Sequence, residues 1–540
     1  MRLLSGRPNV GGRFVVWGWR RADFRLGHRS CMDSVDNTGH QYSAQIKFRT
    51  LVVTIIAAGL AFLDSSIATI ALPSIQRELG ISTSTQQWVA SGYLLTLSAL
   101  LLVGGRLADV FGRRRMFRTG LVLYAVLAGL AALSPNGGFL IAARALQGVA
   151  GAVLVPTTLA LINSVYPPEE RGKAIGTWAA WSAITTLLGP ILGGFVIDNL
   201  SWRFAFVITP VLALLALGMS RSVPESRDEN ADRRLDFAGV ALVAGGIGAI
   251  VFALVQGPVL GWGSAAVVGS AVTGVVLLPL FLWRESRAPS PVMPFGMFSN
   301  RNLAVANVVT FFVYAGLYGM FFYIPLYVQS ALKLSATATG AIFVPNAILL
   351  FFLSPYSGRL NDRFGPRWLM FFGPLVAATG IVVASFTGPG QTLTVLVPGI
   401  ALFGVGLSFT VTPVTATAIG SAEQRYSGIA SGFNNAVSRV AGLVAIALMG
   451  TIVVALWHSG MASASVGASA PVKSALESVS DKAFVIPPTP GMSAVEAGDV
   501  RQRATAAAQK SFREGMWLAA ALVAAGGVVS AVGIQSKPRV

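Results

Sequence analysis

The sequence predicts an all-α polytopic membrane protein made of two six-helix repeats plus two extra central helices, fourteen transmembrane helices in total. Of its 540 residues, 54% are hydrophobic and only 11% are charged, too few polar side chains for a water-soluble surface. The apolar runs reach about 20 residues, which is the length a helix needs to cross a hydrocarbon core of roughly 30 Å. A decapeptide also occurs twice, as GRLADVFGRR at 105–114 and as GRLNDRFGPR at 358–367. A repeat at this spacing indicates that one bundle has been duplicated.

The fourteen helices follow from apolar runs between charged or Pro/Gly-rich breaks. Adding the 253-residue offset of the decapeptides to the first five helix starts gives positions within two residues of starts in the second half. The sixth helix does not match, because an Ala/Ser/Pro-rich insertion precedes its counterpart. The predicted helices are 51–72, 86–105, 117–134, 138–163, 173–197, 202–219, 237–256, 264–283, 302–330, 337–357, 369–386, 392–416, 427–456 and 514–534.

These helices divide the chain into successive regions. The basic first region has no apolar run long enough to span a membrane, so we expect it to be disordered; alternatively, the natural product begins at Met32. The regions are a cytoplasmic N-terminal tail (1–50), a first six-helix bundle (51–219), a linker with two extra helices (220–301), a second six-helix bundle (302–534) with a long external loop (457–512), and a cytoplasmic C-terminal tail (535–540).

The charges of the loops predict the orientation. With the N-terminus inside, the short inner loops carry eighteen Lys or Arg residues and the short outer loops carry three, Arg77, Arg203 and Lys333. This asymmetry is what the positive-inside rule requires. We therefore expect a multi-pass protein of the cytoplasmic membrane with both termini in the cytoplasm.

Composition narrows the possible cofactors and partners. The net charge is +18, but no basic module stands apart from the spans, so the charge does not indicate a nucleic-acid partner. A single cysteine excludes an intramolecular disulfide, and the histidines lie outside the spans or at their edges, so we expect no metal and no cofactor. These residues are Cys31, His28, His40 and His458.

The repeated decapeptide combines glycines with an ion pair. Gly105 and Gly112 permit close backbone approach and a tight turn, and Asp109 can pair with Arg113 or Arg114. Such a cluster would hold the cytoplasmic face shut. A positively charged glycine turn explains the arginines, but it explains neither Asp109 nor the second copy. The corresponding residues of that copy are Gly358, Asp362, Gly365 and Arg367.

Asp64 is the one acidic residue that we place deep in a span. An ionised carboxylate is costly there, so the group can accept a proton from one side and release it to the other, which makes Asp64 the expected proton carrier. The alternative is a polar residue that is hydrogen-bonded in a helix contact.

Arg144 is predicted to lie near Asp64. At 1.5 Å per residue, Arg144 lies roughly 9 Å and Asp64 roughly 12 Å from the outer ends of their helices. A buried guanidinium near the carboxylate would stabilise its charged form, and protonation or substrate binding would break the pair. Alternatively, Arg144 extends outward to the membrane surface.

The helix predicted over 173–197 is rich in glycine around one proline. Pro190 removes a helix hydrogen bond, and the glycines permit a kink and close contact with a neighbouring helix. The residues concerned are Gly176, Gly189, Pro190, Gly193 and Gly194.

Aromatic and amide side chains are candidates for lining a substrate pocket, because aromatic faces accommodate flat, lipophilic or cationic compounds. Most of them equally fit a packing or lipid-facing role. Arg439 is a second intramembrane cation without an acidic partner in the second-half spans, and it could meet an anionic substrate, backbone carbonyls or the first half. The remaining candidates are Trp178, Trp181, Tyr314, Tyr318, Phe322, Asn346 and Asn434.

Four motifs, the first of them present twice, carry a resemblance to a known family: the decapeptides, LDSSIATIALP (63–73), RALQGVAG (144–151) and GPILGG (189–194). With them, residues 51–534 resemble the fourteen-helix drug:proton antiporter family of the major facilitator superfamily. The resemblance implies a proton-driven exporter of hydrophobic or cationic drugs that works as a monomer by alternating access. The sequence departs from the family pattern at Val110, where a cation is usual, and at Thr185, where a glycine is usual.

Two other functions remain open. The same machinery could export one endogenous metabolite or antibiotic. A polytopic membrane enzyme or sensor is a different class, but the predicted spans contain no His, Cys or paired acids, and no soluble domain is predicted to transmit a signal.

Overall fold

Helices make up almost all of the structure, a computed structural model that describes residues 34–35, 41–227, 236–287, 295–422 and 427–535. Twelve helices in these ranges are long and apolar enough to cross a membrane, and a thirteenth qualifies if two segments that meet at 51° within 83–111 count as one span. The all-α membrane fold class is therefore confirmed, whereas the number fourteen stays a prediction. The described strands, β1 (Ser34–Val35) and β2 (Gln41–Tyr42), form one short antiparallel pair.

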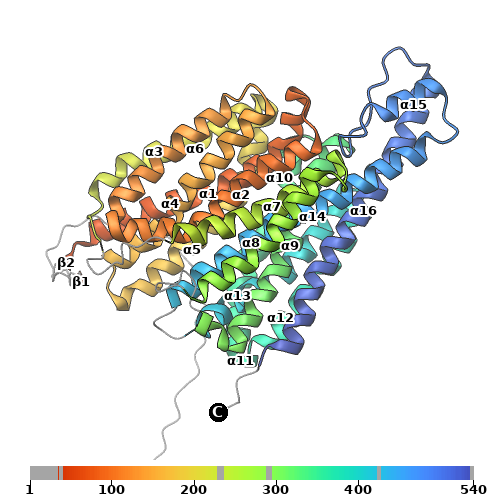
Figure 1. Ribbon diagram of the computed structural model, residues 1–540. Coiled ribbons are helices and arrows are strands. Elements are labelled where there is room, and N and C mark those ends of the chain that lie inside the picture. The colour runs from red at the N-terminus through yellow and green to blue at the C-terminus, as the bar shows by residue number, and fades with distance from the viewer. Residues whose placement is uncertain (1–33, 36–40, 228–235, 288–294, 423–426, 536–540) are drawn as a thin grey trace, which may run out of the picture.

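The first six helices form one bundle, in red to yellow in Figure 1. In this bundle α1 packs against α5 and α6, α2 against α4, and α3 against α4 and α6. The helices are α1 (Ala44–Leu79), α2 (Thr83–Phe111), α3 (Arg113–Ala132), α4 (Gly137–Val165), α5 (Pro168–Asn199) and α6 (Trp202–Met219), followed by the 3₁₀ turn η1 (Ser220–Ser222).

Helix α1 begins earlier than the sequence predicts. The Ser43 hydroxyl accepts a hydrogen bond from the Ile46 amide and caps the helix, and Lys47 pairs with Glu170 at 3.0 Å. Residues 44–50 therefore belong to a helix and not to a disordered tail, because hydropathy marks the apolar part of a helix and not its capped end. Residues 1–33 and 36–40 of the predicted tail lie outside the described residues.

The second half contains more helices than the six that were predicted. A single helix was expected over 337–357, but a break at Phe343, followed by Pro345, divides it into α10 and α11. Pro398 likewise follows the π turn η3. Helix α9 packs against α14 and α16, α12 against α13 and α16, and α11 against α13. The elements are α9 (Arg301–Ser330), α10 (Ala336–Ile342), α11 (Val344–Phe364), α12 (Pro366–Ser385), η3 (Thr392–Leu396), α13 (Val397–Gly420), α14 (Ser427–Ser465), α15 (Ala470–Glu477) and α16 (Ala494–Gly533).

The segment 457–512, which was predicted to be a loop, is largely helical. Helix α14 continues to Ser465, α16 already begins at Ala494, and α15 lies between them. The start of α16 is rich in Ala, Gln, Lys and Arg, which favour a helix without being apolar, and Ser493 and Glu496 form a capping box. These helix ends and α15 protrude beyond the rest of the bundle at the upper right of Figure 1. We call this the α15 end of the molecule and the opposite end the decapeptide end.

The two extra helices form a hairpin at the boundary of the two halves. Helices α7 (Phe237–Leu260) and α8 (Ala265–Glu285) pack against each other, and α7 also contacts α2 of the first half and α14 of the second. A short 3₁₀ segment, η2 (Phe295–Ser299), precedes α9. Most side chains of α8 point away from the protein, as expected for a helix that faces lipid.

The two halves are joined directly at the α15 end. Gln87 donates a hydrogen bond to the hydroxyl of Tyr323 at 3.1 Å, and Gln329 donates to the carbonyl of Ile70 at 3.1 Å. The Thr83 amide donates to the carbonyl of residue 481, and its hydroxyl accepts from the amide of residue 483. Side chains of both halves also share one buried apolar cluster.

Candidate functional site

A buried ion pair lies in the middle of the first half. The guanidinium of Arg144 on α4 donates a hydrogen bond to Oδ2 of Asp64 on α1, and each side chain is only 1% exposed. Gln147, one turn after Arg144, bridges the pair: its Nε2 donates to Asp64 Oδ1 at 3.0 Å, and its Oε1 accepts from Arg144 at 2.7 Å. The structure thus brings together the two charged residues that the sequence assigned to similar depths.

Aromatic rings enclose the cation of this pair. The guanidinium carbon of Arg144 lies 4.5 Å from the ring centroid of Tyr93 and 5.6 Å from that of Phe206. Rings at these distances attract a cation and exclude water. Inside such a pocket the carboxylate depends on Arg144 and Gln147 for compensation of its charge.

The sequence prediction missed Gln147 and Tyr93. Gln147 belongs to the same RALQG motif as Arg144, three residues later on the same helix face, so the spacing could have identified it. Tyr93 lies on α2 and has no signal in the sequence that distinguishes it from other buried aromatic residues.

The first decapeptide links elements of the first half to one another. Arg113 donates to Oδ1 of Asp109 from Nε at 2.9 Å and from a terminal nitrogen at 2.8 Å. Arg114 instead contacts Glu225, which follows α6 and also accepts from the backbone amides of Arg114 and Arg115. These bonds tie the α2–α3 turn to the segment after α6, whereas a clasp across the cytoplasmic face was expected.

The second decapeptide has the same turn but different contacts. Gly112 and Gly365 both have positive φ angles, 104° and 78°, which explains a glycine at this position of each copy. Arg367 donates to the carbonyl of Ala531 on α16 at 2.9 Å. Asp362 is exposed and forms no ion pair among the described residues. Gly105 and Gly358 have ordinary contacts with their surroundings, so close approach does not require glycine there.

The glycines of α5 face two different helices. A Cβ on Gly189 or Gly193 would collide with Ser66 or Ile67 of α1, and a Cβ on Gly194 would lie 2.4 Å from the carbonyl oxygen of Ala336 on α10. Glycine therefore permits α5 to touch both halves of the molecule. The carbonyl of Pro190 approaches Gly340 of α10, whereas Gly176 has open space around it.

Asp198, at the end of α5, caps α10 of the other half. Its carboxylate accepts from the amides of Ala336 and Thr337 at 2.9 and 2.7 Å and from the Thr337 hydroxyl at 2.6 Å. Partial burial raises the pKa of Asp198, but the bonds from Thr337 and Ala336 outweigh it and hold this pKa below its usual value. This contact could not be predicted from the sequence, because the partners of Asp198 are mainly backbone amides.

The predicted pocket residues do not form one cluster. Tyr314, Tyr318 and Arg439 lie close together at the boundary with α1. The others are separate: Trp181 is 53% exposed, and Trp178 is partly buried on the same helix. The remaining residues pack inside the second half, with Phe322 against Tyr323, Asn346 against Gly404, and Asn434 donating to Asn307 and Thr310.

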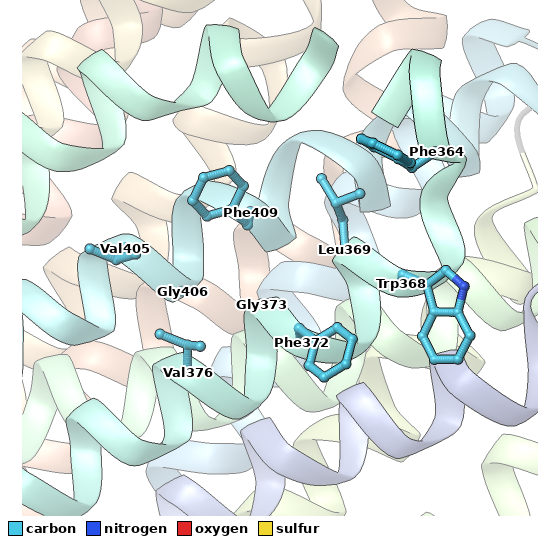
Figure 2. A pocket seen from close by; sticks show the side chains of 9 residues that line it. All are labelled: Phe364, Trp368, Leu369, Phe372, Gly373, Val376, Val405, Gly406 and Phe409. Atoms are coloured by element: carbon cyan, nitrogen blue, oxygen red, sulfur yellow. The ribbon is translucent and has the colours of Figure 1, made fainter. Parts of the chain in front are cut away.

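A hollow of about 330 Å³ lies between α12 and α13, away from the ion pair (Figure 2). Its lining is apolar, with four aromatic rings and no charged side chain, so nothing in it would orient a polar group. The hollow therefore fits a lipid-facing surface better than a coupling site. Its lining residues are Phe364, Trp368, Leu369, Phe372, Gly373, Val376, Val405, Gly406 and Phe409.

The sequence has relatives among known transport and resistance proteins. The family model of the Major Facilitator Superfamily matches residues 54–446. The chain is 37% identical over 407 residues to the puromycin resistance protein pur8 of Streptomyces alboniger, covering 74% of this chain and 81% of that protein. It is 32% identical over 417 residues to the multidrug resistance protein Stp of Mycobacterium tuberculosis, covering 76% and 77%.

A third relative is the methylenomycin A resistance protein of Bacillus subtilis, with 30% identity over 438 residues that cover 80% of this chain and 91% of that protein. Among solved structures, a bacterial homologue of the human lysosomal transporter Spinster matches with a TM-score of 0.65 and 15% identity, covering 92% and 100% of the two chains. At this identity the structural match concerns the fold alone.

Proposed function

Because the chain belongs to the Major Facilitator Superfamily, we propose that it is a proton-coupled antiporter that exports lipophilic drugs or toxic compounds across the cytoplasmic membrane. The relatives named for resistance to puromycin, methylenomycin A and multiple drugs support export of such compounds. The protein is a transporter that acts as a monomer, and the proton gradient drives it without a cofactor.

The buried pair of Asp64 and Arg144 is the observation that carries this proposal. The carboxylate is enclosed, and it is compensated by one guanidinium and one amide. When Asp64 takes up a proton, the attraction that holds α1 to α4 is lost, and when the proton leaves, the attraction returns. Proton binding can in this way bias the first half between two packing arrangements.

The contacts between the halves indicate which state this structure represents. With the decapeptide end in the cytoplasm, as the loop charges predict, the direct hydrogen bonds between the halves lie on the external side. The molecule is then closed to the outside, as an inward-facing or an occluded transporter is. Export requires these external bonds to break as the halves rock about the site.

Export of one dedicated compound is the second candidate. The relatives named for resistance to puromycin or to methylenomycin A are each named for a single antibiotic. The same coupling site serves either function, because the two differ only in the breadth of the substrate pocket.

Uptake into everted membrane vesicles tests the proposal. Vesicles from cells that lack their own drug pumps, with and without the protein, are given a panel of fluorescent lipophilic compounds, and the pH gradient is then collapsed with nigericin. We expect accumulation that needs both the protein and the gradient. Uptake that persists without a gradient would exclude proton coupling, and transport of one panel member alone would favour the dedicated exporter.

A further inference from the structure

Arg439 is a buried cation that the coupling site does not use. It lies on α14 and is only 6% exposed, and its guanidinium carbon is 5.7 Å from the ring centroid of Phe62 on α1. The side chain therefore reaches from the second half to the first. Among the described residues it forms no hydrogen bond and no ion pair, yet none of its nitrogens is completely enclosed. The guanidinium is thus unpaired, and its nitrogens keep some accessible surface.

Aromatic side chains of both halves surround this cation. Tyr314 of α9 lies within electrostatic range of Arg439, and the Tyr314 and Tyr318 rings are 6.4 Å apart. A Cβ on Gly442, one turn after Arg439, would lie 2.6 Å from the Tyr318 ring, so α9 and α14 touch there. With Phe62 these rings form a surface that suits a flat apolar group beside the charge.

The charges of the core do not cancel. Five charged side chains are buried among the described residues, and Lys47 and Glu285 are at helix ends near the decapeptide end. In the middle remain Asp64, Arg144 and Arg439, with a sum of +1 when Asp64 is ionised. An unpaired charge inside a membrane protein is costly and is retained mainly for function.

We propose that Arg439 binds an anionic group of the exported compound, a carboxylate or phenolate on an aromatic, otherwise lipophilic molecule. One such group would bring the sum of core charges to zero and would form charge-assisted hydrogen bonds with the free guanidinium. A monovalent cation would instead raise the charge of the core to +2. This inference rests on the proposed export function and narrows its substrates from hydrophobic or cationic drugs to lipophilic acids.

Binding to the purified full-length protein in detergent tests the proposal without depending on transport. The probes are 7-methoxycoumarin-3-carboxylic acid, its ethyl ester and ethidium, and binding is followed by fluorescence polarisation. We expect the acid to bind about 10- to 100-fold more tightly than the ester or ethidium, the range that a hydrogen bond to a charged group contributes. Arg439→Gln should abolish this preference and leave ester binding within about threefold, whereas Arg439→Lys should retain most of it.

Three results would overturn the inference: equal or tighter binding of the ester or of ethidium by the wild-type protein, failure of the wild-type protein to bind any probe, or an unchanged preference in Arg439→Gln. If Arg439→Gln does not fold, displacement of the bound acid from the wild-type protein tests the inference instead. Benzoate should displace the acid and benzamide should not, and displacement by both or by neither would contradict an anion site. Transport into vesicles, measured separately from binding, distinguishes failure of this inference from failure of the proposed export function. Gradient-driven uptake without acid preference contradicts the role of Arg439 alone, and acid preference without gradient-driven uptake contradicts the export function.

Discussion

The two six-helix halves share a fold but differ in chemistry. The first half contains Asp64, Arg144 and Gln147 in mutual contact, all buried. The positions 253 residues further along the chain are Leu317, Val397 and Ile400, which are all apolar; Ile400 belongs to the buried core and the other two pack against it. The two halves thus have similar helix packing, but only the first carries an acid at these positions. Under the proposed proton coupling, one titrating site would serve both halves.

The second half also contains a group of buried, hydrogen-bonded polar side chains, and this group is neutral. Asn434 on α14 donates to the side chains of Asn307 and Thr310 on α9, at 3.1 and 2.8 Å. Such bonds hold helices together without responding to pH. The first half thus contains a buried carboxyl group, whereas these bonds of the second half join neutral groups, and four experiments test what this difference means.

Asp64→Asn should have the largest effect. The amide keeps the shape but cannot gain or lose a proton, so we expect gradient-driven uptake in everted vesicles to fall to the level of vesicles without the protein. Asp64→Glu keeps a carboxyl group and serves as the control, with partial activity. Normal proton exchange by Asp64→Asn would show that the carrier lies elsewhere.

Gln147→Leu should cost more stability than Asn434→Leu. The first change removes two hydrogen bonds to buried charged groups, at about 1.5–3 kcal/mol each, and the second removes two neutral hydrogen bonds of about 1 kcal/mol each. Thermal unfolding in detergent, followed by tryptophan fluorescence, measures both. Repeating Gln147→Leu in the Asp64→Asn background should reduce its cost, and equal costs in both backgrounds would argue against the bridge.

Asp109→Asn should reduce transport modestly, and Asp362→Asn should not change it. Asp109 pairs with Arg113 on a partly exposed surface, where such a pair contributes at most about 1 kcal/mol, or roughly fivefold. Asp362 has no ion pair to lose among the described residues. Initial uptake rates at equal protein levels measure both variants, and similar losses would mean that the two decapeptides act alike.

The smallest effect of the four is expected from acidification on the contact between Asp198 and α10. The hydrogen bonds of Asp198 to α10 hold its pKa below the usual value, so the link is stabilising above that pKa and is lost only as pH falls through it. Lowering the pH from about 7 to about 5 should leave the distance between fluorophores on α5 and α10 unchanged. Separation over this range would make Asp198 a second proton sensor in the first half.

Much of the fold was predictable, because lipid requires long apolar helices and the repeated decapeptide sets the register of the second half. The similar depths of Asp64 and Arg144 predicted that the two could meet, but depth left open whether Arg144 extends outward instead. The helical form of 494–513 was not, since hydropathy detects spans, and a helix rich in Ala, Lys and Arg outside the membrane gives no such signal.

Side-chain directions were the least predictable part of the site. Helices such as α1 are apolar nearly all round, so the sequence does not tell which side faces the partner half. The sequence therefore made Phe322, Asn346 and Tyr314 equal candidates for lining the substrate pocket. In the structure the first two pack inside the second half. Glu225 and Asp198 were missed because each acts largely on backbone amides far away in the sequence.

The α7–α8 hairpin has a consequence for the route by which a compound leaves the bilayer. Helix α7 contacts both α2 and α14 and so covers the seam between the halves on one flank. On the opposite flank, where α5 meets α10 and α11, no described helix is interposed. Under the proposed export function, a compound dissolved in the bilayer therefore meets the seam between the halves directly on the α5 flank, and the hairpin shields the seam on the other flank.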